Sequence, residues 1–150
     1  MKTLLNRLFA PGDNTCAVNA ALLVFRLWLG LTMLLNHGWT KFSGFATIKE
    51  KFPGVLGMSP EASLGLAVFA ELVCSALLVI GLVTRFAALN LAITMGVAFM
   101  VAHGHALKGE HSGELPYVYL AGFVMLLLAG PGKFSADACV FGKPATPVSK

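Results

Sequence analysis

The sequence predicts an all-α membrane protein: a four-transmembrane-helix bundle with short interfacial helices. Of its 150 residues, 57% are hydrophobic and 12% are charged, whereas a soluble domain carries about 25% charged residues. The length allows one small bundle and no second domain. The basic residues, which give a net charge of +4, lie in short flanks of the apolar runs. They therefore indicate membrane topology and contact with the lipid bilayer, and not nucleic-acid binding.

Four apolar segments are expected to cross the bilayer, at about 17–38, 62–83, 85–103 and 116–130. The second has 22 residues and a single charge, Glu71. At about 1.5 Å per residue it is long enough to cross a hydrocarbon core of roughly 30 Å. Ser59 and Pro60 predict its start, because a capping hydroxyl precedes proline at the first helical position. Residues 81–84 predict a tight turn in which Thr84 caps the third helix.

The four spans belong to one predicted membrane domain at 17–138. Residues 1–16 read as an amphipathic interfacial lead, residues 45–52 as a short interfacial helix, and residues 139–150 as a mobile tail. Four spans place both termini on one side of the membrane. That side collects six basic residues against four on the other, which predicts cytoplasmic termini in a bacterial-type inner membrane.

Two charges lie well inside apolar runs, Arg26 and Glu71. Each is about nine residues, or about 13 Å, from the predicted start of its helix, and the helices enter from opposite faces. In a core of roughly 30 Å their heights differ by about 4 Å, which predicts an ion pair between them. Such a pair either fixes helix packing alone, or forms a polar site that binds a substrate headgroup or relays protons.

Histidines gather at the predicted outer mouth, where His37 and His103 end two of the spans near Lys41. Histidine titrates near neutral pH and can move protons. No carboxylate completes a ligand set at a diagnostic spacing, so neither metal nor haem is predicted. The sequence has no hydrolytic triad or nucleotide-binding loop. Redox chemistry would therefore need an external cofactor or a lipid-soluble carrier.

Three stretches carry a family resemblance: LLNHGWTKF at 34–42, AELVCSALLVIGLVTRFAAL at 70–89 and GPGKFSADA at 130–138. With the arginine of the first span, this ordered set resembles the DoxX family of small four-helix membrane proteins, over roughly residues 20–138. The resemblance implies a membrane subunit linked to quinone chemistry, as in thiosulfate:quinone oxidoreductase and terminal quinol oxidase assemblies. The positions that match the family are Arg26, His37, Lys41, Glu71, Arg85 and Asp137.

The expected function is an integral membrane subunit of a quinone- or quinol-linked redox system. Glu71, Arg26 and His103 are its candidate catalytic residues. The candidate substrate-binding residues are His37, Lys41, Arg85 and Asp137. The cofactor expected is a quinone, and whether the chain is an oxidoreductase by itself stays open.

The alternative is a non-enzymatic membrane scaffold that docks or stabilises a soluble oxidoreductase, in oxidative stress or detoxification. Under either reading, the expected partners are a soluble oxidoreductase, another membrane subunit or a second copy of the chain. Copurification with a soluble protein would favour this alternative.

Overall fold

The computed structural model describes residues 15–141, and all regular structure within that range is helical. The expected interfacial lead at 1–16 and tail at 139–150 lie largely outside the described residues. Three helical segments, Thr15–Ser43, Pro60–Ile80 and Thr84–Ala102, are long and apolar enough to cross a membrane. A shorter apolar helix covers Glu114–Ala129.

The first segment is one continuous rod made of α2 (Thr15–Met33), η1 (Leu34–Gly38) and α3 (Trp39–Ser43). Its 29 residues correspond to about 44 Å, which exceeds a hydrocarbon core of roughly 30 Å. The sequence predicts an end near His37, but no proline or turn sequence interrupts the rod before Gly44. The short α4 (Phe45–Ile48) follows.

The second segment consists of α5 (Pro60–Val68), η2 (Phe69–Cys74) and α6 (Ser75–Ile80). It starts as the sequence predicts, because the Ser59 side chain accepts a hydrogen bond of 3.2 Å from the amide of Ala62 and Pro60 is the first helical residue. It ends at Gly81, whose φ of 77° is a left-handed conformation that glycine adopts without strain.

The third segment joins α7 (Thr84–Val97) to η3 (Ala98–Ala102), and α8 (Glu114–Ala129) and α9 (Ala136–Phe141) complete the fold. The predicted cap by Thr84 is wrong. Val83 occupies the cap position with a φ of 44°. The carboxylate of Asp137 accepts hydrogen bonds from the amides of Val83 and Thr84, at 2.7 and 2.9 Å.

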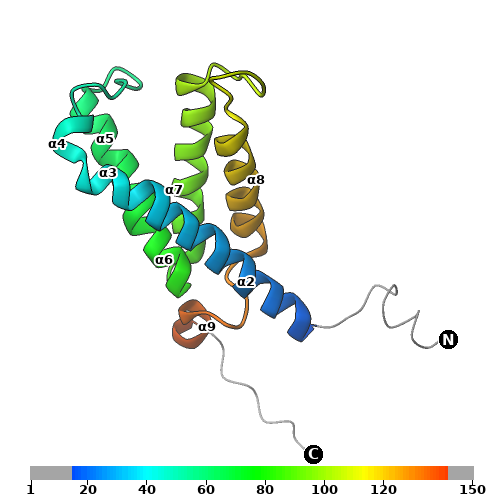
Figure 1. The fold of residues 1–150 in the computed structure, drawn as a ribbon. Coiled ribbons are helices and arrows are strands. Elements are labelled where there is room, and N and C mark those ends of the chain that lie inside the picture. Colours follow the sequence, from blue (N-terminus) through cyan, green and yellow to red (C-terminus); the bar gives the residue numbers. More distant parts are fainter. Residues whose placement is uncertain (1–14, 142–150) are drawn as a thin grey trace, which may run out of the picture.

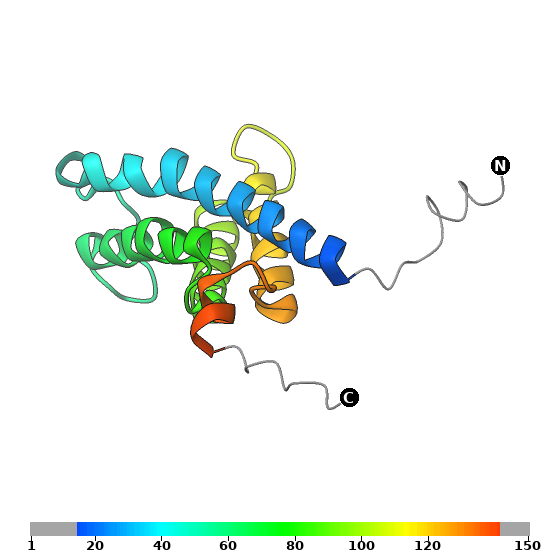
Figure 2. The ribbon, with the colours of Figure 1, turned by 90° about the horizontal axis from the view of Figure 1, so that it is seen from below.

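The helices form two pairs (Figure 1). In one, α2 packs along α6 and η1 packs against η2; in the other, α7 packs against α8. Seen from below, α2 lies beside α5 and α6, and this pair is inclined to the α7–α8 pair (Figure 2). The core that joins the pairs includes Met33, Leu78, Leu91 and Phe123, all buried. We call the end with loops 49–59 and 103–113 the loop end, and the end with the 81–83 turn and α9 the terminal end (Figure 1).

Candidate functional site

A buried ion pair joins the first two helical segments toward the loop end. Lys41 Nζ donates to Glu71 Oε2 at 2.5 Å. The Glu71 side chain is 5% exposed and that of Lys41 is 24% exposed. Lys41 therefore supplies the countercharge that a carboxylate needs inside an apolar helix.

The position of this pair depends on a close contact between backbones. A Cβ added to Gly38 would collide with the carbonyl group of Glu71 and would lie 2.7 Å from the amide nitrogen of Leu72. Only glycine fits there, so η1 approaches η2 closely and Lys41, one turn later, reaches Glu71. Both segments are π-helical, a geometry that is frequent at functional sites.

The predicted pairing of Arg26 with Glu71 is wrong. The Arg26 guanidinium is buried and donates to the carbonyl oxygens of Pro131 and Phe134, at 2.6 and 2.8 Å. It lies against Gly81, where an added Cβ would come within 2.8 Å of Arg26 Cζ. Gly81 follows Glu71 by ten residues, which is about 15 Å along a helix. Arg26 and Glu71 therefore lie toward different ends of the molecule.

The error comes from the assumption of equal depth. Residues nine positions from each helix start lie at similar heights only if both helices are upright and equally long. The first helix instead continues to Ser43, and Gly38 lies level with Glu71. Gly38 follows Arg26 by twelve residues, a displacement of about 18 Å.

Arg26 and Asp137 together tie the chain after α8 to the terminal end. Burial is the largest influence on the pKa of Asp137 and raises it. The hydrogen bonds from Thr84 and Val83 and the positive charge of Arg26 outweigh burial, so the pKa lies below its ordinary value of 3.8. Arg85 is also at this end, with an exposed contact of 3.4 Å to the Leu128 carbonyl. The structure does not bring Arg26, Arg85 or Asp137 to the Lys41–Glu71 pair.

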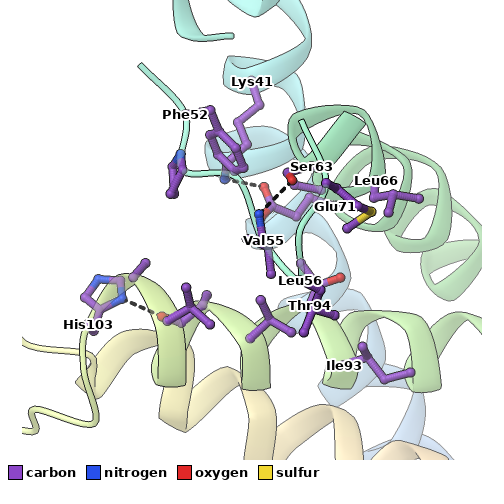
Figure 3. Close-up of a pocket in the computed structure, with 17 residues that line it drawn as sticks. Lys41, Phe52, Val55, Leu56, Ser63, Leu66, Glu71, Ile93, Thr94 and His103 are labelled. Carbon is purple, nitrogen blue, oxygen red and sulfur yellow. Dashed lines mark hydrogen bonds and ion pairs between the residues drawn. The ribbon is translucent and has the colours of Figure 1, made fainter. Parts of the chain in front are cut away.

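A cavity of about 340 Å³ opens beside the ion pair, between the two inclined helix pairs. Lys41, Ser63 and Glu71 lie on one wall, and Thr94 and His103 lie on the α7–η3 wall opposite (Figure 3). The loop from Phe52 to Met58 covers the cavity. The remaining lining residues are all apolar: Phe52, Pro53, Val55, Leu56, Met58, Leu66, Ala67, Ile93, Val97, Ala98, Val101 and Ala102.

His103 directly follows η3 and lines the cavity across from the ion pair (Figure 3). Its Nδ1 lies 2.9 Å from the carbonyl oxygen of Ala98. Because a carbonyl only accepts, Nδ1 carries the proton in this contact and Nε2 is left to accept, or to donate when the ring is cationic.

The other histidines have different surroundings. The His37 ring is half-buried and meets the Tyr119 ring edge to face, with 5.8 Å between centroids. It lies one turn before Lys41 but does not line the cavity. His105 and His111 are exposed in the 103–113 loop. Within residues 15–141, no group of three or more His, Cys, Asp or Glu side chains could hold a metal ion.

Sequence reasoning missed the polar lining residues Ser63 and Thr94 and the covering loop. A signal was present for the first two, because each is a hydroxyl inside an otherwise apolar span. Ser63 is buried, and its Oγ accepts a hydrogen bond of 3.0 Å from the amide of Val55, which holds the loop over the cavity. The return of the loop onto α5 had no comparable signal.

Comparison with known proteins places this arrangement in a family. The DoxX family model matches residues 21–104, more than half of the chain. The chain belongs to the DoxX family. The matched region holds Lys41, Glu71 and the cavity wall as far as His103, whereas Asp137 lies beyond it. The apolar helices and this membership make the chain a membrane protein.

Two uncharacterized proteins of Haemophilus influenzae are similar to this DoxX chain. One is 30% identical over 126 residues, which cover 80% of this chain and 83% of the relative. The other is 32% identical over 117 residues, which cover 74% and 84%. No solved structure matches the chain. These relatives extend the family resemblance over most of the fold but name no reaction.

Proposed function

We propose that this DoxX chain is a membrane subunit that binds a quinone or quinol in the cavity beside Lys41 and Glu71. The observation that carries the proposal is the lining of the cavity. Apolar side chains form most of it, while an ion pair lies on one wall and a histidine on the other. Apolar pockets with a few convergent polar groups are the usual form of small-molecule sites.

The polar groups suit the two ends of a quinone ring. The Lys41 ammonium has three donors, and Glu71 uses one of them. A second is available for a carbonyl oxygen of the ring. His103 Nε2 would serve the opposite oxygen, as donor to a quinone or as acceptor from a quinol hydroxyl.

Glu71 and His103 are the residues that would hold or release protons. Reduction of a quinone takes up protons together with electrons, and the ring supplies that redox chemistry. The electrons would come from a separate redox protein. Arg26, Arg85 and Asp137 have no part in this site, since they stabilise the terminal end.

We further propose that α8 makes a fourth crossing of a bacterial inner membrane, with both termini on the cytoplasmic side. The 16 residues of α8 correspond to about 24 Å, which a nearly upright helix or a locally thinner bilayer accommodates. Its packing along α7 supports this. A membrane-impermeant thiol reagent applied to intact cells should label the Lys108→Cys variant at position 108. It should not label the Lys133→Cys variant at position 133.

The test of the binding proposal is a quinone titration of the purified protein, followed by thermal unfolding. Wild type and His111→Ala should show saturable stabilisation, because His111 is an exposed loop residue. His103→Ala should show little, although it folds. If well-folded wild type gains no stability from any quinone, the proposal fails, and a scaffold that binds a soluble oxidoreductase becomes the function to test by copurification.

A further inference from the structure

The cavity reaches the surface of the bundle at a place that faces lipid. Leu66 on α5 and Ile93 on α7 both line it, yet they are 55% and 57% exposed. A residue that lines a cavity and is also half exposed lies at its edge. Both belong to segments long and apolar enough to cross the membrane, so this edge opens toward hydrocarbon and not toward water.

The charged residues of the cavity do not form its exposed edge. The Glu71 side chain and Ser63 are buried, and the Lys41 side chain is 24% exposed. Leu66 and Ile93 carry no polar side-chain atom. A ligand that satisfies both parts therefore has a hydrogen-bonding head and an apolar tail that leaves between α5 and α7.

We propose that Leu66 and Ile93 form a lateral portal through which the tail of a lipid-soluble quinone projects into the bilayer. This rests on the proposed function and adds that affinity depends on the tail. The covering loop supports lateral entry. Its Val55 amide donates to Ser63 Oγ at 3.0 Å, so the loop is held against α5, while Leu66 and Ile93 stay exposed at the edge of the cavity.

The test compares two quinones that share one ring, one with an isoprenoid tail and one with a methyl group in its place. Both are titrated in lipid nanodiscs against wild type, Leu66→Trp and Ile93→Trp. The matched control is Leu89→Trp, because Leu89 lies one turn before Ile93, is 43% exposed and does not line the cavity. The exposed positions tolerate the indole ring without disturbing the core.

Each portal variant should weaken binding of the tailed quinone by about tenfold, while the methyl quinone binds as it does to wild type. Leu89→Trp should change neither affinity. Equal binding of the tailed quinone to the portal variants and to Leu89→Trp would overturn the portal and leave the quinone site standing. Failure of wild type to bind either quinone would overturn both proposals.

Discussion

Lys41 Nζ lies 2.5 Å from Glu71 Oε2, although 30 residues separate them in the sequence. The contact requires η1 and η2 to touch at Gly38, where no side chain larger than hydrogen fits. The same contact brings both charges to the wall of the cavity. The pair thus links the packing of the first two helices to the chemistry of the proposed site.

Breaking this pair from one side should destabilise the protein strongly. Glu71→Gln leaves an unpaired lysine and Lys41→Met leaves an unpaired buried carboxylate, each at a cost of about 3–5 kcal/mol. The double variant should recover part of the loss, because no unpaired charge remains. Chemical unfolding of the four proteins in one detergent measures this cycle.

The exposed pair Lys49–Glu61 is the control for this cycle. Its charges are 3.7 Å apart, and both side chains are more than one-third exposed. Such surface pairs contribute about 0–1 kcal/mol, so Lys49→Met should change stability little. A loss for Lys49→Met as large as that for Lys41→Met would contradict the special role of the buried pair.

A methyl group at Gly38 should separate the first two helices. Gly38→Ala places Cβ against the Glu71 backbone, and overpacking of this kind costs about 1–3 kcal/mol. It should also lower quinone affinity, since the cavity wall moves. Gly65→Ala is the matched control, because nothing lies within 4 Å of its added Cβ and alanine favours a helix by about 0.5–1 kcal/mol. A neutral Gly38→Ala would show that the contact is loose.

Loss of the Arg26 guanidinium should release the chain after α8 without affecting the cavity. Arg26→Met removes two hydrogen bonds to carbonyl oxygens, each worth about 1.5–3 kcal/mol when the donor is charged. Trypsin should then cut faster after Lys133, which is exposed. Arg85→Met, which loses only an exposed contact, should leave the cleavage rate unchanged. A large loss of quinone binding in a folded Arg26→Met variant would contradict this and show that Arg26 contributes to the site.

Asp137 should make stability depend on pH at the acidic end. Its pKa is lower in the folded chain than the ordinary 3.8, so the folded state favours the ionised carboxylate. This stabilisation is complete above the ordinary pKa and is lost as the pH falls through the lowered value. Asp137→Ala removes the cap on α7, at a cost of about 0.5–2 kcal/mol at neutral pH. Its unfolding midpoint should fall less than that of wild type as the pH is lowered from about 5 to below the ordinary pKa of 3.8.

Local signals in the sequence were enough to place some of the helix ends. Ser59, Pro60 and Gly81 mark the ends of the second helical segment as expected, because caps and glycine turns depend on neighbouring residues. The overlong first rod was missed, since nothing in its sequence indicates how far it is inclined. Depth counted from an assumed membrane face then paired Glu71 with the wrong cation.

The sequence indicated several of the site residues, but not which of them are in contact. An intramembrane carboxylate predicts a partner, and Glu71 has one in Lys41. The choice between Lys41 and Arg26 depends on the Gly38 contact, which is a tertiary feature. The Phe52–Met58 loop and Ser63 line the cavity because the chain folds back onto α5. The sequence does not indicate where this loop packs.

The central claim is that a quinone binds between the Lys41–Glu71 wall and the His103 wall. The most direct test is photo-crosslinking with a photoreactive quinone in nanodiscs, followed by peptide mass spectrometry. The account predicts labels on the Phe52–Met58 loop and on residues 93–103, which excess unlabelled quinone removes. Labels spread evenly over exposed positions such as Trp28 and Leu128, and unaffected by competition, would contradict it.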